Sequence, residues 1–509
     1  MTTNEAHAAL RSALLTLIQI IELPLVAGVS LMAIFTERLE PRYLQYGLAL
    51  LLVPMLLRLA VAGRVVAPTL TLWPLLLLVA LGGLSIYVTP AWVYTWPELV
   101  RLLAGVALAL AVINWLNPIT IGRSTPNQRV GAGRIIVATV VFLTLCGGLT
   151  VVGLLAMQAT HKFLPALPWD GVARIKALTT TGTFNPNRVA GVAVLATPLV
   201  CALLLGSLRS DRPTVAGWLG WLVAKVAALL LSVGFGGALL LTESRGALLA
   251  AACALLALLP LLGRRGWLIL LMVAVVGVAL LSEVQPGDLD RFVIRDRRAT
   301  AAQASSDSAW ATILQDRNLQ GRLILWRRAL HGMADAPLTG MGLGAFEAVS
   351  QEPYPQVAGF VPDPDMSHVH NILLQVGLDL GLPGLLSFVA LLAMIAFLLL
   401  RLLRHSRHVA PLHTWGVGLC GSFVAYLLYN MLDALTLGSR PALAVWCFFG
   451  LCIGAGERRR TPVVAPRRVA VHRRPQPVAP IPAQPPRPVA EASNWEERAW
   501  AITAGDQQR

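Results

Sequence analysis

Two histidines and an asparagine stand where a long polar segment meets an apolar one. They are His368, His370 and Asn371, which directly precede the apolar run 372–382. An imidazole at an aqueous boundary can take up a proton near neutral pH, and a helix beginning directly behind it would fix its position. We predict His370 as a catalytic residue. We predict Asn371 and His368 as substrate-binding residues, with a supporting or loop role as the alternative for His368.

Two arginines stand at the beginnings of other apolar runs. Arg188 ends the sequence Asn-Pro-Asn-Arg, which also contains Asn187, and Arg245 ends Thr-Glu-Ser-Arg. Guanidinium groups suit bidentate binding of phosphate, and helix N-termini attract anions. We predict that Arg188 and Arg245 hold a diphosphate as catalytic residues and that Asn187 binds substrate. The alternative is that both arginines only anchor helix ends at the membrane surface.

A polar stripe continues from the histidines into the apolar run. Asn371, Gln375 and Asp379 are four residues apart and share one face of a helix. An acid within an apolar helix is costly and usually faces the interior of a bundle. We interpret Gln375 and Asp379 as polar groups that join helices.

A metal site is not predicted. Asp363 and Asp365 precede the histidines, and such carboxylates and imidazoles could bind a divalent ion. A solvated loop is the favoured interpretation of these two acids, so we expect neither a metal nor another cofactor. All cysteines fall within apolar runs, which predicts neither disulfides nor thiolate-bound metal.

The composition predicts an all-α polytopic membrane protein. Of the 509 residues, 56% are hydrophobic and 13% are charged, which is atypical of soluble domains. The net charge of +15 lies largely in short loops and the C-terminal tail, so it indicates topology rather than binding of nucleic acid. About twelve runs are long enough to cross a bilayer: 12–34, 42–62, 69–87, 98–116, 134–157, 187–207, 215–241, 245–262, 266–283, 371–400, 413–435 and 440–455.

The basic residues predict the orientation. If the N-terminus is cytoplasmic, the inner loops carry most arginines, among them Arg64, Arg264 and Arg401, whereas the short outer loops carry few. Both termini then lie in the cytoplasm, and the candidate site residues face the outside. The outer loop 284–369 is long and contains a predicted amphipathic helix near 320–334.

That helix has Arg322, Trp326 and Leu330 on one face, and the sequence Asp-Ala-Pro at 335–337 ends it. Glycines at 340, 342 and 344 predict a flexible turn region after it. The tail from about 461 is rich in proline and arginine and cannot form a packed core, which predicts disorder.

These motifs together resemble the bacterial O-antigen ligase and O-antigen polymerase superfamily. His370-Asn371 is followed by Gly-Leu-Pro-Gly at 381–384, and the segments ending at Arg188 and Arg245 are similar to the two arginine motifs of that family. The sequence from Arg322 to the glycine turn resembles the start of its large periplasmic loop. The resemblance covers residues 180–400.

The resemblance implies a membrane glycosyltransferase of the C-type architecture in the bacterial inner membrane. Such proteins transfer a glycan from undecaprenyl diphosphate to an acceptor hydroxyl at the periplasmic face, without a metal and with inversion. A ligase uses a glycolipid acceptor, a sugar of the lipid A core. By resemblance, His370 is the general base, Arg188 and Arg245 bind the diphosphate, and Arg322 binds substrate.

The apolar runs, the tail composition and the resemblance together predict four regions. These are the N-terminal transmembrane helices at 1–157, a ligase-like catalytic region at 158–400, the C-terminal transmembrane helices at 401–460 and a disordered cytoplasmic tail at 461–509. The expected partners are the lipid-linked donor, the glycolipid acceptor and membrane lipid, but not nucleic acid.

Other functions remain open at this stage. A polysaccharide polymerase and a protein O-oligosaccharyltransferase would use the same residues. A transporter of polysaccharide or lipid-linked glycan belongs to another class, in which polar groups lie at the bilayer midplane. A receptor or scaffold would not need the arginine pair.

Overall fold

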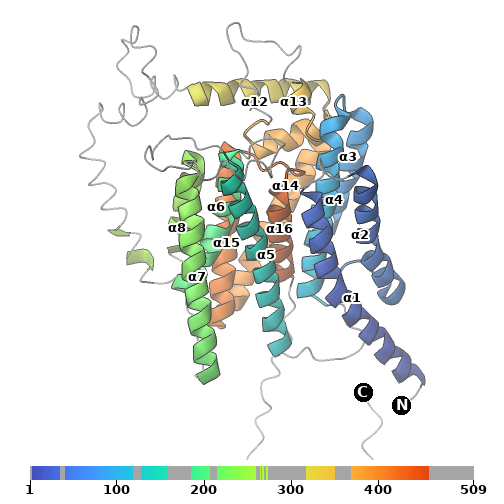
Figure 1. Cartoon of the computed structure of the whole chain (residues 1–509), viewed down its shortest axis with the longest axis vertical. Coiled ribbons are helices and arrows are strands. Elements are labelled where there is room, and N and C mark those ends of the chain that lie inside the picture. The colour runs from blue at the N-terminus through green and yellow to red at the C-terminus, as the bar shows by residue number, and fades with distance from the viewer. Residues whose placement is uncertain are drawn as a thin grey trace, which may run out of the picture. The chain divides into compact units, whose positions relative to one another are not determined.

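The computed structural model describes residues 3–34, 40–118, 128–157, 185–206, 215–259, 317–349 and 368–457, with a few more between 264 and 272. All regular elements within these ranges are helices (Figure 1). The chain divides into two compact units, Met1–Arg459 and Arg460–Arg509. The second unit lies outside the described residues, and so does the predicted disorder of the tail.

Most of the described residues lie in apolar helices, as they do in a polytopic membrane protein. Eight are long and apolar enough to cross a membrane: α1 (Thr3–Ala33), α2 (Pro41–Ala62), α4 (Trp92–Leu116), α5 (Gln128–Ala156), α6 (Pro186–Leu205), α7 (Val215–Leu241), α14 (Ile372–Ser406) and α15 (Ala410–Leu432). Three shorter ones are α3 (Leu72–Val88), α8 (Arg245–Leu258) and α16 (Ala442–Gly456). Each predicted run coincides with one of these helices, except 266–283, which lies largely outside the described residues.

The core forms around the helices that are apolar on every side. All residues of α16 are buried, and so are most of those of α4, with which α16 packs most extensively. A helix that is hydrophobic all round belongs inside a bundle rather than at its edge. Helices α6 and α15 form the second large contact, and this second pair carries part of the candidate site.

Charged residues within the apolar helices have local partners. Glu22 of α1 is paired with Arg58 of α2, and its carboxylate also accepts a hydrogen bond from Asn114 of α4 at 3.1 Å. The sequence offered no partner for Glu22. Lys225 of α7 donates to three carbonyl groups at the end of α6, at 2.5–2.9 Å. A lysine in this position satisfies carbonyl groups that the helix itself leaves unpaired.

The predicted amphipathic helix is present as α12 (Arg317–Asp335), which contacts α14 and lies across the bundle in Figure 1. It ends at the predicted residue. Its packed face is centred on Leu325 and Ala329, next to the face predicted from the sequence. On the predicted face Arg322 and Trp326 are half-buried, whereas Leu330 is 55% exposed. Aliphatic packing, rather than the arginine and the indole, therefore sets the rotation of α12.

The glycine turn after α12 is docked on α14. Gly340, Gly342 and Gly344 all have positive φ, and the amides of residues 341 and 342 donate to carbonyl groups of α14 at 2.8 and 3.0 Å. Those carbonyl groups are accessible because α14 breaks at Gly381, with φ 70° and ψ −176°. A left-handed or extended-left conformation of this kind favours glycine. The turn is thus held by hydrogen bonds, where the sequence predicted flexibility. The short helix α13 (Phe346–Val349) follows.

Candidate functional site

The end of α15 touches the beginnings of three other helices. The Tyr429 hydroxyl donates to the carbonyl group of Asn187 at the start of α6. Gly246, the second residue of α8, lies beside Leu432. The Asn371 amide, directly before α14, donates to a carbonyl group in the last turn of α15 at 3.5 Å. Segments that are far apart in the sequence therefore meet at one end of the bundle.

Asparagine caps fix two of these helix beginnings. The Asn185 side chain accepts from the amide of Asn187 at 2.9 Å, and Pro186 occupies the first helical position. The Asn371 side chain accepts from the amides of Leu373 and Leu374 at 3.0 and 3.2 Å. Such caps satisfy amides that have no partner within the helix. The caps hold the residues that precede and follow them in defined positions.

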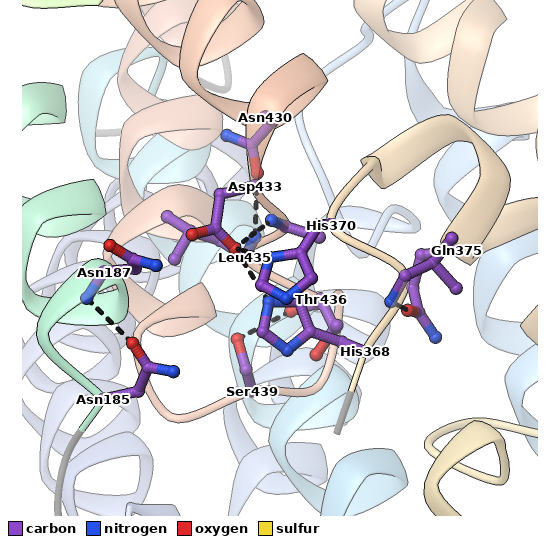
Figure 2. A network of polar contacts seen from close by, with 12 residues as sticks. Asn185, Asn187, His368, His370, Gln375, Asn430, Asp433, Leu435, Thr436 and Ser439 are labelled. Carbon is purple, nitrogen blue, oxygen red and sulfur yellow. Dashed lines mark hydrogen bonds and ion pairs between the residues drawn. The ribbon is translucent and has the colours of Figure 1, made fainter. Parts of the chain in front are cut away.

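Both histidines are directed at one carboxylate. Asp433, the residue directly after α15, places Oδ1 2.7 Å from Nε2 of His368 and 3.1 Å from Nδ1 of His370 (Figure 2). The two imidazole centroids are 4.2 Å apart. The side chains of His368 and Asp433 are buried, and that of His370 is 13% exposed. Only one of the two imidazoles is thus accessible from outside.

Neighbouring groups fix the backbone on both sides of this contact. The carboxylate of Asp433 also accepts from the amide of Ala434 at 2.8 Å, and Asn430 accepts from the amide of Leu435 at 2.8 Å. His370 itself has φ +57°, which is uncommon for a residue other than glycine. A strained residue of this kind persists where the surrounding structure determines it.

Burial and hydrogen bonding set the charges of the cluster. Burial alone would raise the pKa of Asp433, but the hydrogen bonds from His368 and His370 outweigh it and hold the pKa well below its usual range. Burial lowers the pKa of His368 to about 4, against the opposing effect of Asp433. Near neutral pH, Asp433 is therefore an anion and His368 is a neutral imidazole.

The anionic carboxylate determines the tautomer of His370. A carboxylate can only accept, so Nδ1 of His370 carries the hydrogen that it donates to Asp433. A neutral imidazole then has its lone pair on Nε2. Among the described residues, none forms a hydrogen bond with that atom. His370 has the arrangement of a base that is oriented by an acid and open to a proton donor.

The three predicted arginines differ in their exposure and in the residues of the site that they affect. The positive charges of Arg188 and Arg322 both act on the Tyr429 hydroxyl, and the charge of Arg188 also acts on His368. Arg188 and Arg322 are half-buried. Arg245 is exposed at the first residue of α8, whose second residue adjoins the end of α15. The structure thus brings Arg188 and Arg322 to Tyr429, Arg188 also to His368, and places Arg245 at the adjoining helix beginning.

The cluster also has the composition of a metal-binding set. One ligand atom from each of His368, His370 and Asp433 lies within 4.8 Å of the others. As arranged, however, Oδ1 of Asp433 already accepts from both imidazoles and a backbone amide. The arrangement fits a hydrogen-bonded cluster better than a ligand set. The predicted acids Asp363 and Asp365 lie outside the described residues.

Two residues of the site were missed from the sequence, Tyr429 and Asp433. Both fall within the apolar run predicted at 413–435. The available signal was Asp433 itself, because an acid in an apolar run usually faces a functional interior. That argument was applied to Asp379 and applies equally here.

The site and the fold define a polytopic helical membrane protein with an acid–imidazole cluster at one end of its bundle. The family described as O-antigen ligase matches residues 226–389. This match confirms the resemblance to the O-antigen ligase and polymerase superfamily, whose activity is of the membrane glycosyltransferase type. A search of curated proteins gave no match.

Proposed function

We propose that the chain is an O-antigen ligase-type glycosyltransferase. It transfers a glycan from undecaprenyl diphosphate to a hydroxyl of a glycolipid acceptor, a sugar of the lipid A core. The observation that carries this proposal is the contact between His370 and Asp433, which leaves the lone pair on Nε2 of His370. The match of residues 226–389 to the O-antigen ligase family supports the same reaction class.

In the proposed reaction, the acceptor oxygen attacks the anomeric carbon of the donor glycan. The hydroxyl proton passes to Nε2 of His370 while the bond between the anomeric carbon and the diphosphate breaks. A positioned base of this kind contributes about 100- to 10,000-fold in rate. Asp433 stabilises the imidazolium, and a single displacement inverts the anomeric configuration.

Arg188 and Arg245 bind the diphosphate, whose negative charge grows as it leaves. Arg322, from α12, adds a third cation, whose charge acts on Tyr429 as that of Arg188 does. The N-terminal ends of α6 and α8 favour the same anion. Asn187 at the start of α6, and His368 and Asn371 directly before α14, bind substrate at the same end of the bundle. His368 also holds Asp433 in place through its hydrogen bond.

We further propose about twelve spans and a C-type glycosyltransferase fold in the bacterial inner membrane. Both termini lie in the cytoplasm, and the site faces the periplasm. Helix α12 lies across the same end of the bundle as the site, as a periplasmic covering segment would (Figure 1).

A polymerase or a protein O-oligosaccharyltransferase remains the alternative within the same chemistry, because the acceptor determines the difference. The position of the charged groups disfavours a transporter. Its charged groups would lie near the middle of the spans, whereas His370, Asp433 and Arg188 lie at helix ends.

The proposal is tested by separating surface glycolipids and carrier-linked glycans on a gel. A strain lacking the gene receives either the wild type or His370→Ala. For a ligase, long glycans accumulate on the carrier, and only the wild type restores them to the acceptor. Single repeat units on the acceptor would instead indicate a polymerase. Full rescue by His370→Ala would contradict the role of His370 as the base.

A further inference from the structure

Two buried polar residues of α14 form a chain of hydrogen bonds that reaches the histidine turn. The Gln375 side-chain oxygen accepts from the amide of Val369 at 2.9 Å, and its side-chain nitrogen donates to Asp379 at 2.9 Å. Gln375 is 1% exposed and Asp379 2% exposed. The two side chains therefore bond along α14 and to the turn before it, and Asp379 in addition joins α14 to the glycine turn after α12.

We propose that Gln375, oriented by Asp379, is a positioning residue that holds the turn His368–Val369–His370 so that the His370 imidazole meets Asp433. This inference rests on the proposed function, in which His370 is the base. Neither Gln375 nor Asp379 touches the imidazole of His370, so neither is a catalytic residue.

The direction of the Gln375 amide is determined by its two partners. The amide of Val369 can only donate, so the oxygen of Gln375 must face it and the nitrogen must face Asp379. Asp379 also accepts from the backbone of Gly344 in the docked glycine turn. This bond from the turn after α12 fixes the carboxylate of Asp379. The fixed carboxylate then prevents the side-chain amide of Gln375 from flipping its oxygen and nitrogen.

Val369, whose amide donates to Gln375, directly precedes the strained residue His370. Val369 is fully buried, so its amide has no access to water if Gln375 is removed. His370 follows with φ +57°. A left-handed residue relaxes to a common conformation when its neighbours no longer determine it. That relaxation would rotate the imidazole away from Asp433, and the proposed base would lose its orientation.

Three variants of the full-length protein test this role, purified in detergent for hydrogen exchange and expressed in the strain lacking the gene for transfer. Gln375→Leu removes both hydrogen bonds at similar size. The double variant Gln375→Glu with Asp379→Asn restores both bonds. The new carboxylate at position 375 accepts from the Val369 amide as the wild-type oxygen does, and the new amide at position 379 donates to that carboxylate, so donor and acceptor are exchanged in this second bond alone. Ser387→Ala is the control, because Ser387 is a buried residue of α14 whose hydroxyl donates to the carbonyl group of Pro74 at 2.9 Å.

Two measurements are compared for each variant. Hydrogen–deuterium exchange of the peptide that contains Val369 reports the turn itself, and the gel of surface glycans reports transfer. We expect Gln375→Leu to accelerate exchange and to lower transfer, each by at least about tenfold, because a buried donor loses its acceptor. The double variant and Ser387→Ala should stay within about threefold of the wild type, because each buried donor near the turn keeps a partner.

The positioning role is overturned if folded Gln375→Leu shows normal exchange and normal transfer. If His370→Ala is inactive at the same time, the proposed function remains intact. If Gln375→Leu does not fold, the double variant decides: fast exchange and slow transfer there would also overturn it. Activity of His370→Ala would contradict the proposed function itself, and the exchange of Val369 would still report whether Gln375 holds the turn.

Discussion

Replacing Asp433 by asparagine removes the charge of the site and keeps the shape of the side chain. In the wild type, Oδ1 of Asp433 accepts from His368 at 2.7 Å, from His370 at 3.1 Å and from the amide of Ala434 at 2.8 Å. An asparagine oxygen can retain the bond to Ala434. It offers the imidazolium of His370 a neutral partner in place of an anion.

The size of the effect follows from this difference. A hydrogen bond to a charged group contributes about 1.5–3 kcal/mol, and a neutral one about 0.5–1.5 kcal/mol. The proposed transition state, in which His370 becomes cationic, therefore loses about 1–1.5 kcal/mol, which slows transfer by about 5- to 12-fold. Removal of the base should cost about 100-fold or more. Asp433→Asn should thus be slower than the wild type and faster than His370→Ala.

Transfer rates are measured with carrier-linked glycan extracted from the deletion strain, at equal amounts of folded protein. Thr436→Val is the matched control. Thr436 lies three residues beyond Asp433 and donates to Glu98 at 3.2 Å, rather than to an imidazole. A wild-type rate for Asp433→Asn would refute the orienting role of Asp433. An equal loss in Thr436→Val would show that the loop as a whole, and not the carboxylate, matters.

Three further outcomes are expected. Arg188→Lys should lower transfer at least about tenfold because lysine cannot bind a diphosphate in the bidentate manner, whereas Arg327→Lys, on the exposed side of α12, should not. Folding lowers the pKa of His368 from 6.5 to about 4, so between these pH values the imidazole is protonated in the unfolded chain and neutral in the folded one. The free energy of unfolding should therefore drop by about 2 kcal/mol from pH 7 to pH 5. His368→Gln should show a smaller fall in Tm over the same range. Treatment with EDTA should leave transfer unchanged, and a loss restored by added Zn²⁺ or Mn²⁺ would instead indicate that His368, His370 and Asp433 hold a metal.

The positions of the helices were readily predicted because long apolar windows dominate the sequence. The beginnings of α6 and α14 were also predicted closely, since Asn185-Pro186 and Asn371 are strong start signals. The same signals located Arg188 and His370. Helix beginnings are local features, and local sequence determines them.

The contacts between segments could not be predicted in this way. The docking of the glycine turn depends on the break of α14 at Gly381, which the apolar run predicted at 371–400 does not indicate. The pairing of Asp433 with the histidines spans more than 60 residues and depends on how α14 and α15 pack. Hydropathy indicates that each helix is buried but does not indicate which neighbour it meets.

The electrostatic arrangement explains why the site lies at helix ends. Asp433 stands at the C-terminal end of α15, where the helix dipole disfavours an anion. The neighbouring N-terminal ends of α6 and α14, together with the donors on His368 and His370, oppose this effect. In the proposed reaction the leaving diphosphate acquires charge near Arg188 while His370 becomes a cation. In that proposal the bundle places the anion of Asp433 behind the base and the cation of Arg188 before the leaving group, so both charges that develop in the transition state meet a partner that is already in position.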